Sequence, residues 1–203
     1  MSTPTNRNVC YRCYRPQSSC MCDDINPIET NTRFILLMHP KEFRKTKNGT
    51  GHFTHLSLPN SELFVGIDFT KNDQIQSIIN DPKNACFVLY PSSKSINLNE
   101  NTIASQNKNI IIFLIDATWP CSRAILSASP DIDQLPKVSF THEEVSKFTF
   151  KEQPKPYCLS TMESTLILLK LLNKHRIENI EETKLKHFLR PFEKMVAYQL
   201  SCV

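Results

Sequence analysis

Residues 110–123 read Ile-Ile-Ile-Phe-Leu-Ile-Asp-Ala-Thr-Trp-Pro-Cys-Ser-Arg. The six apolar residues that precede Asp116 are typical of a strand buried on both faces of a sheet. Polar groups that follow such a strand lie where open α/β sheets bind ligands. The same stretch also fits a plain strand followed by a helix, with Thr118 or Trp119 as its cap and Pro120 in its first turn. The pattern alone leaves both interpretations open.

Strand and helix patterns alternate along the rest of the chain. Apolar runs predict further strands at 34–38, 63–67, 85–90 and 138–140. Helical patterns predict helices at 73–79, 120–129, 166–172 and 181–201. Asp73 is the expected cap of the first helix, and Ser160 and Glu163 form a capping box before the third. We expect loops at 41–55 and 92–109. The alternation predicts an α/β fold with a mainly parallel sheet flanked by helices.

The composition is that of a globular domain. Hydrophobic residues make up 40% of the 203 residues and charged residues 22%, which argues against a disordered chain. The apolar runs are too short to span a bilayer, and the N-terminus lacks the apolar core of a signal peptide. We therefore expect a cytoplasmic protein with no membrane partner. The sequence indicates no obligate protein partner.

Positive charge is concentrated in one short segment. Residues 33–55 contain five Lys or Arg residues and one Glu, a net charge of +4, which equals the net charge of the whole chain. Such a patch favours a polyanionic partner, although a solvated loop face is an equally good interpretation of its lysines. The three glycines form neither a G-x-G-x-x-G nor a P-loop motif, which argues against those nucleotide sites.

Four cysteines lie close together near the N-terminus: Cys10, Cys13, Cys20 and Cys22. In a cytoplasmic chain, such cysteines favour a metal site or free thiols over disulfides. Four thiolates close a tetrahedral zinc site and leave no open position, so the predicted zinc is structural. We expect residues 1–30 to form this zinc-binding element and residues 31–203 to form the main domain.

Four segments at strand ends or at a helix start carry polar groups. They are 39–51, 89–92, 116–123 and 157–163. Parallel strands bring the first three to one edge of the sheet, and the fourth ends in a helix N-terminus that suits an anion. Each also has a plain structural interpretation. His39 can be a satisfied strand-end histidine, and Ser160 and Glu163 can simply cap their helix.

These motifs together resemble a known family. Asp116-x-Thr118-Trp119 with Arg123 is the signature of the DTW-domain family. The cysteines with Arg15-Pro16 resemble its N-terminal element. The other matching segments are His39-Pro40-x-Glu42, Leu89-Tyr90-Pro91-Ser92, Leu159-Ser160-Thr161-x-Glu163 and Phe192-x-x-Met195-Val196-x-x-Gln199. The resemblance covers essentially the whole chain, with the motifs in the same order.

The resemblance implies a tRNA-uridine aminocarboxypropyltransferase. Such enzymes use S-adenosylmethionine to make 3-(3-amino-3-carboxypropyl)uridine in tRNA and release methylthioadenosine. It also implies a SPOUT-like fold, in which a deep C-terminal knot forms the cofactor site. The helix after Ser160 would then be threaded through the knot.

The resemblance also implies roles for individual residues. The residues expected around the cofactor are Leu89, Tyr90, Pro91, Ile115, Ala117, Leu159, Ser160 and Thr161. Those expected at RNA are His39, Arg44, Lys45, Lys47 and Arg123. The predicted catalytic residues are Asp116, Thr118 and Trp119. Asp116 is either the general base for uridine N3 or an electrostatic partner of the sulfonium or α-amino group.

Two rival functions stay open at this point. One is a SPOUT-type RNA methyltransferase, which uses the same cofactor and releases adenosylhomocysteine. The other is a zinc-containing RNA-binding protein without catalysis. The carboxylate of Asp116 argues against the second, because a surface that only binds phosphates has no use for it.

Overall fold

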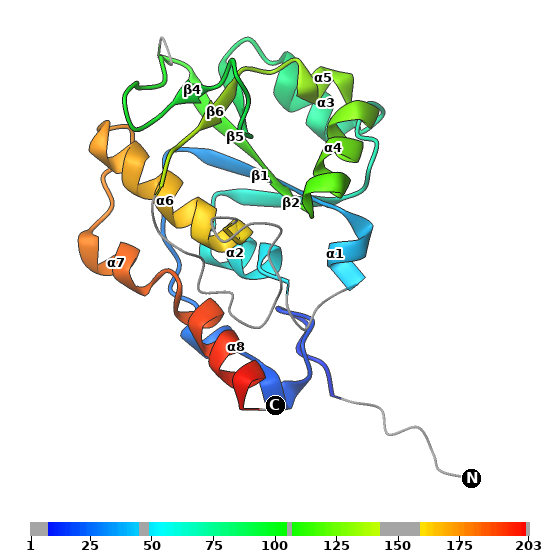
Figure 1. The fold of residues 1–203 in the computed structure, drawn as a ribbon, viewed down its shortest axis with the longest axis vertical. Helices are drawn as coiled ribbons and strands as arrows, with labels where there is room; N and C mark the ends of the chain where they lie inside the picture. The colour runs from blue at the N-terminus through cyan, green and yellow to red at the C-terminus, as the bar shows by residue number, and fades with distance from the viewer. Residues whose placement is uncertain (1–7, 45–48, 105–106, 143–158, 202–203) are drawn as a thin grey trace.

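In the computed structural model, which describes residues 8–44, 49–104, 107–142 and 159–201, six strands form one sheet (Figure 1). Their order across the sheet is β2 (Ser61–Val65), β1 (Arg33–Met38), β5 (Asn109–Asp116), β3 (Asn84–Leu89), β6 (Lys137–Ser139) and β4 (Ile96–Asn97). Neighbouring strands pair in parallel throughout. The predicted parallel sheet is confirmed.

Strand β5 lies between β1 and β3 and supplies both cores of the protein. Its side chains alternate, so Ile112 and Leu114 enter one core, and Ile111 and Phe113 enter the other. Burying each of these side chains contributes roughly 1.5–3 kcal/mol. The run that precedes Asp116 is therefore apolar because both of its faces are covered.

Helices cover both faces of the sheet (Figure 1). Helices α2 (Gly51–Ser57), α6 (Thr161–Lys174), α7 (Glu182–His187) and α8 (Arg190–Leu200) pack on the face of Leu114. Helices α3 (Asp73–Asn80), α4 (Trp119–Ala128) and α5 (Pro130–Asp133) pack on the face of Phe113. A short helix α1 (Pro40–Arg44) follows β1. None of the helices in the described ranges is long and apolar enough to cross a membrane.

The structure corrects four details of the sequence prediction. The expected loop at 41–55 contains most of α1 and the start of α2, and the expected loop at 92–109 contains β4. Asn72, and not Asp73, caps α3, because its side chain accepts from the Ile75 amide at 3.0 Å. The last predicted helix is two helices, since Pro191 lacks the amide that a continuous helix requires.

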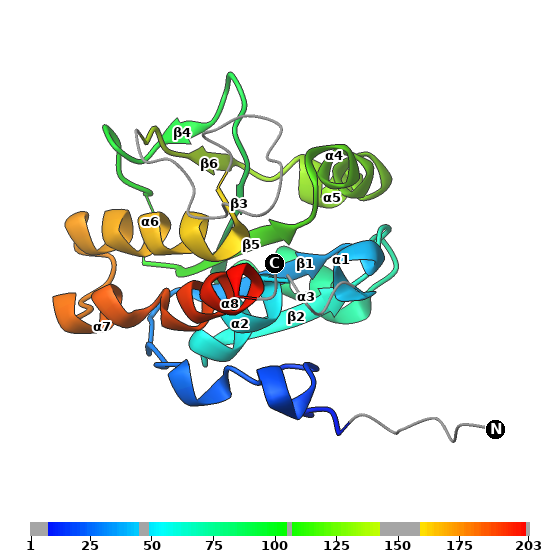
Figure 2. The same ribbon diagram turned by 60° about the horizontal axis from the view of Figure 1, so that its bottom comes forward.

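The N-terminal element packs beneath α2 and α8 (Figure 2). Two single-turn 3-10 helices, η1 (Gln17–Ser19) and η2 (Cys22–Asp24), lie within it. Its buried residues Met21 and Ile28 share a core with Phe53 of α2, and Lys194 Nζ of α8 lies 2.7 Å from Asp24 Oδ2. The element is therefore joined to the main fold, and a domain boundary at residue 30 stays a prediction.

The chain leaves β1 and β5 in opposite directions across the sheet. From β1 it passes to β2 on one side, and from β5 it passes to β6 on the other. Open α/β sheets bind ligands at the carboxyl ends of two such strands. Asp116 ends β5 at this point, and its carbonyl accepts from the His39 amide at 3.1 Å. The connection from β6 to α6 falls largely outside the described residues, and the knot stays a prediction.

Candidate active site

A cavity of about 390 Å³ opens at the carboxyl edge of the sheet, a size typical of small-molecule sites. Strands β3, β5 and β6 end at it, and helices α4 and α6 begin beside it. Its lining residues are Leu89, Tyr90, Pro91, Leu114, Ile115, Ala117, Trp119, Ser122, Ser139, Phe140, His142, Leu159, Thr161 and Ser164. Apolar and aromatic side chains dominate, and a few hydroxyls and one imidazole supply polarity.

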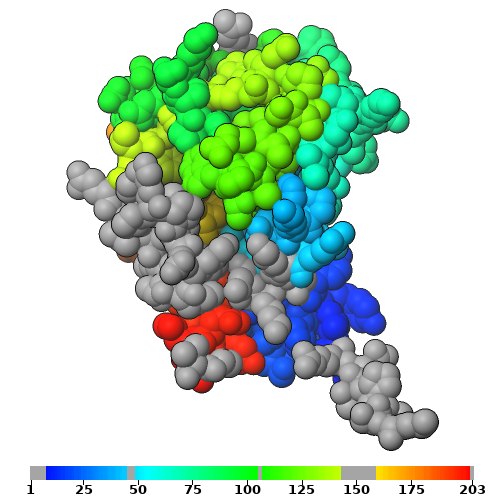
Figure 3. Space-filling model, turned by 45° about the vertical axis from the view of Figure 1, so that its right-hand side comes forward, coloured from blue at the N-terminus to red at the C-terminus, as the bar shows by residue number. Residues whose placement is uncertain are grey.

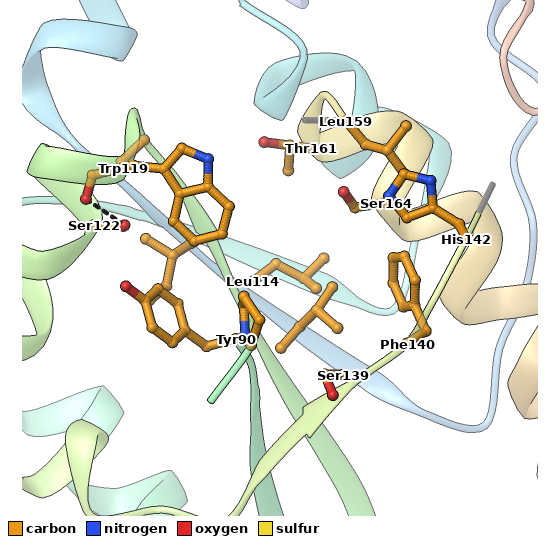
Figure 4. Close-up of a pocket in the computed structure, with 14 residues that line it drawn as sticks. Tyr90, Leu114, Trp119, Ser122, Ser139, Phe140, His142, Leu159, Thr161 and Ser164 are labelled. Carbon is orange, nitrogen blue, oxygen red and sulfur yellow. Dashed lines mark hydrogen bonds between the residues drawn. The ribbon is translucent and has the colours of Figure 1, made fainter. Parts of the chain in front are cut away.

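Aromatic side chains stand on two sides of the cavity (Figure 4). Trp119 meets Tyr90 edge to face, with ring centroids 5.8 Å apart, while Phe140 and His142 lie opposite them. Ser122 Oγ donates to the Trp119 carbonyl at 2.9 Å and holds the first turn of α4. Trp119 keeps 38% of its surface exposed, so part of its ring is available for contact with a ligand in the cavity.

The Asp116 side chain lies behind the cavity wall. By the alternation of β5 it points to the same face as Leu114, and only 5% of its surface is exposed. Its Oδ1 accepts from Thr161 Oγ1 at 2.6 Å, and Thr161 itself lines the cavity. Since the threonine proton is given to Asp116, the lone pairs of the Thr161 hydroxyl are left for a donor in the cavity.

Gly51, at the start of α2, leaves the space that Asp116 occupies. A Cβ atom on Gly51 would lie 2.3 Å from Asp116 Oδ2 and 2.6 Å from Met38 Cε. No side chain fits there without moving the carboxylate or the methionine. Glycine is therefore required at this position by the packing of α2 against the end of β5.

The N-terminus of α6 is capped by its own side chains. Ser160 Oγ accepts from the Glu163 amide at 3.3 Å, and the Ser160 amide donates to Glu163 Oε2 at 2.8 Å. The predicted capping box is confirmed. Ser160 does not line the cavity, and the next residue, Thr161, is the one that faces it.

The cavity brings together most of the residues predicted for a cofactor. Seven of the eight line it, and Ser160 is the exception. Trp119 also lines it, whereas Asp116 and Thr118 do not, and Thr118 is the N-cap residue of α4. The remaining lining residues were not predicted from the sequence: Leu114, Ser122, Ser139, Phe140, His142 and Ser164. Ser139 and Phe140 lie at the end of a predicted strand. Because ligands bind at the carboxyl ends of parallel strands, these two residues could have been predicted from the sequence.

The residues predicted for RNA are more dispersed. Arg44 is exposed at the end of α1, and Arg123 is exposed on α4. His39 is buried, and its Nδ1 accepts from the Lys41 amide at 3.1 Å, so its ring shapes the turn into α1. Lys45 and Lys47 lie outside the described residues.

The four N-terminal cysteines converge on one point. Their sulfur atoms lie within 4.8 Å of one another, with Cys10 Sγ 3.6 Å from Cys22 Sγ and Cys13 Sγ 3.8 Å from Cys20 Sγ. Zn–S bonds of about 2.3 Å in a tetrahedron place sulfur atoms about 3.8 Å apart. The backbone amide of Cys13 lowers the pKa of the Cys10 thiol to about 6. Burial raises the pKa of Cys13 and Cys22, a preference that a bound cation reverses.

Arg15 connects this cluster to α2. Only 2% of its surface is exposed, its Nε donates to the Ser19 carbonyl at 3.1 Å, and its guanidinium lies 5.5 Å from the centre of the Phe53 ring. Burial lowers the pKa of Arg15, and the charges of Cys13 and Cys20 oppose that shift. A buried cation is costly unless an anion lies near it. Four thiolates around a bound cation would provide that anion.

A family model described as "DTW domain" matches residues 7–200, nearly the whole chain. The chain belongs to the DTW-domain family. The structure places the signature residues of the family at or near the cavity. Asp116 accepts a hydrogen bond from Thr161 behind the cavity wall, Trp119 forms one wall of the cavity, and Arg123 is exposed on the next turn of α4.

Curated DTW-domain relatives carry a shared description. The chain is 28% identical over 204 residues to tRNA-uridine aminocarboxypropyltransferase 2 of Drosophila melanogaster, covering 97% of this chain and 77% of the fly protein. It is 29% identical over 199 residues to the protein of that name from Mus musculus, covering 96% of this chain and 64% of the mouse protein. The chain thus spans less than two thirds of the mouse relative. No solved structure matches.

Proposed function

We propose that this protein is a tRNA-uridine aminocarboxypropyltransferase that uses S-adenosylmethionine. The observation that carries the proposal is the cavity at the end of β5, where residues of the DTW signature meet those of two other shared motifs, 89–92 and 159–163. The descriptions of the curated relatives support the reaction. The proposal places residues 1–30 in a zinc element and residues 31–203 in a SPOUT-like catalytic domain with a knot, in a cytoplasmic enzyme.

The size and lining of the cavity support S-adenosylmethionine as its ligand. Its volume of about 390 Å³ falls within the range of small-ligand sites. The aromatic and aliphatic walls suit an adenine ring, and the hydroxyls of Ser139, Thr161 and Ser164 suit ribose and amino-acid groups. When bound, S-adenosylmethionine supplies an electrophilic γ-carbon next to a positively charged sulfur.

Asp116 and Thr161 give the cavity a site for positive charge. Thr161 Oγ1 donates to Asp116 Oδ1, so its oxygen presents lone pairs to the cavity with a carboxylate directly behind it. Such a pair stabilises a sulfonium or an α-ammonium group. The geometry therefore favours the electrostatic role for Asp116 over the role of general base, since the carboxylate does not line the cavity.

The transfer forms a bond from uridine N3 to the γ-carbon and breaks the bond from that carbon to sulfur. The sulfur keeps the electron pair and leaves as methylthioadenosine, while the N3 proton passes to a base. His142 lines the cavity and is the imidazole there, so we propose it as that base. As one wall of the cavity, Trp119 would limit the approach to one side and so direct N3 to the γ-carbon rather than to the methyl group.

The cysteine cluster fits a structural zinc ion. Four sulfur ligands at tetrahedral spacing and a buried arginine nearby match a site with net negative charge. Cys10, Cys13, Cys20 and Cys22 would hold the ion. Its contribution would be to fix the N-terminal element on α2 and α8.

One experiment tests the function directly. The protein is incubated with unmodified tRNA and S-adenosylmethionine, and the nucleosides and the cofactor product are analysed by mass spectrometry. We expect 3-(3-amino-3-carboxypropyl)uridine together with methylthioadenosine. Methyluridine with adenosylhomocysteine would show a methyltransferase, and tRNA binding without any product would show a binding protein. A His142→Gln variant should lose product formation and keep tRNA binding.

A further inference from the structure

We infer that the turn of the cysteine element and helix α1 form a stacking surface for an unpaired base of RNA. This surface consists of Tyr14 and Phe43 and is called the stacking surface below. The inference rests on the proposed function for the identity of the RNA, a tRNA. It adds a binding subsite outside the cavity, which is built from a separate part of the chain.

The rings of the stacking surface lie together although 29 positions separate them in the chain. Tyr14 and Phe43 have ring centroids 5.9 Å apart, and 46% of Tyr14 and 36% of Phe43 are exposed. Tyr11, on the same turn as Tyr14, is 92% exposed. Exposed apolar side chains that gather on a protein surface are a common feature of binding sites, which motivates the inference.

A buried histidine supports the two rings. His52 of α2 lies 5.1 Å from the Tyr14 ring centre and 5.4 Å from that of Phe43. Burial lowers the pKa of His52, and the charge of His55 lowers it further, so the ring is neutral at physiological pH. The uncharged ring of His52 therefore packs against both exposed rings and holds their orientation.

The exposed charged side chains on the turn and on α1 are positive. Arg12 on the turn and Lys41 and Arg44 on α1 are all exposed, whereas the single acidic residue of α1, Glu42, is buried. Aromatic rings next to cations are the arrangement by which proteins hold single-stranded RNA, since rings stack on bases and cations bind phosphates. A paired duplex does not offer a free base face, so the predicted ligand is an unpaired nucleotide.

The stacking surface and the cavity open at the same edge of the sheet. Helix α1 begins one residue after His39, whose amide bonds the Asp116 carbonyl. Figure 3 shows α4, α1 and the N-terminal element following one another on one face of the molecule. Uridine N3 is a pairing atom, so the target base must also be unpaired. The same unpaired loop of tRNA can therefore supply both nucleotides.

The test compares variants that remove a ring with variants that keep it. The dissociation constant for unmodified tRNA is measured without S-adenosylmethionine, at several salt concentrations. Tyr14→Leu and Phe43→Leu should each weaken binding about tenfold or more, while Tyr14→Phe and Phe43→Tyr should bind like the wild type. The salt dependence should keep its slope in the Leu variants and lose about one unit of slope in Arg44→Gln.

Several outcomes would overturn the inference. Wild-type affinity in both Leu variants would show that the rings do not contact RNA. The exposed rings would then be assigned to contact with a protein partner instead. Equal loss of affinity in Phe43→Tyr and Phe43→Leu would show a packing role. The nucleoside assay is run on the same wild-type sample. If it yields no aminocarboxypropyluridine while the Leu variants bind weakly, the proposed function fails and the stacking surface stands.

Discussion

Thr161 Oγ1 donates a hydrogen bond of 2.6 Å to Asp116 Oδ1 and connects the first turn of α6 to the end of β5. The carboxylate is buried, and the hydroxyl lines the cavity. The carboxylate of the family signature is therefore connected to the cavity through a threonine. This relationship favours the electrostatic interpretation of Asp116, one of the two that the sequence left open.

If Asp116 acts through Thr161, the two residues contribute as a unit. Asp116→Asn and Thr161→Val should each lower kcat by about 100-fold or more, because each removes an aligned charge or dipole. The double variant should be little worse than either single variant. Steady-state kinetics with unmodified tRNA measures both effects.

Thr165→Val is the matched control for that experiment. Thr165 lies one turn further along α6, and its hydroxyl donates to the Thr161 carbonyl at 2.7 Å within the helix. This variant should keep kcat within a few-fold. Fully additive losses in the double variant would contradict coupling between Asp116 and Thr161.

Replacing Gly51 should disturb the same carboxylate from the other side. The new Cβ of Gly51→Ala would meet Asp116 Oδ2 at 2.3 Å, so we expect a loss of about 1–3 kcal/mol in the free energy of unfolding and a large loss of activity. Denaturant unfolding and the product assay measure the two effects. In Gly66→Ala the nearest atom is Phe69 Cε1 at 2.9 Å, and neither residue lines the cavity. That control should lose stability and keep kcat.

Trp119 offers a direct readout of cofactor binding. It is the single tryptophan of the chain and lines the cavity, so S-adenosylmethionine should change its fluorescence without tRNA. Calorimetry should show Trp119→Leu binding about tenfold more weakly and Trp119→Phe within a few-fold, because Phe keeps an edge-to-face contact with Tyr90. Unchanged fluorescence at saturating cofactor would place the ligand elsewhere.

The fold was largely predictable because the signals for it are local. The apolar run before Asp116 and the capping box at Ser160 are each decided within a few residues. Helices α1 and α2 were missed because both are short, and α2 is stabilised by packing against β1 and α6, which a local pattern does not report. The direction of Asp116 was also hidden. Alternation gives its face, but only the fold shows that α6 brings Thr161 to that face.

Removal of the predicted zinc should destabilise the whole fold. The purified protein should contain about one zinc per chain, and Cys20→Ser should lose it, since three remaining thiolates bind less tightly. We expect the midpoint of thermal unfolding to fall by at least about 5 °C. Cys121→Ser removes a thiol of α4 outside the cluster and should keep both zinc and stability. A zinc-free protein with the wild-type midpoint would contradict a structural ion.

Stability should fall in mild acid because of two histidines on α2. Burial lowers the pKa of His52, with a further contribution from the charge of His55, and burial lowers the pKa of His55 against the influence of Glu62. Above the ordinary value of 6.5 both are neutral in the folded and the unfolded chain. Below it the unfolded chain takes up protons that the folded chain does not bind, so the free energy of unfolding decreases.

The slope of that decrease identifies the residue. His52→Phe keeps a ring between Tyr14 and Phe43 but removes the titration, so the free energy of unfolding should fall less steeply between pH 6.5 and 5.5 than in the wild type. Each such group contributes at most about 1.4 kcal/mol per pH unit. Urea unfolding at each pH measures the free energy of unfolding of the zinc-loaded wild type and of the zinc-loaded His52→Phe variant. Both proteins keep the cysteine cluster, so its response to acid cancels when the two are compared. Parallel curves for the two proteins would mean that His52 titrates alike in both states, which its burial between two aromatic rings argues against.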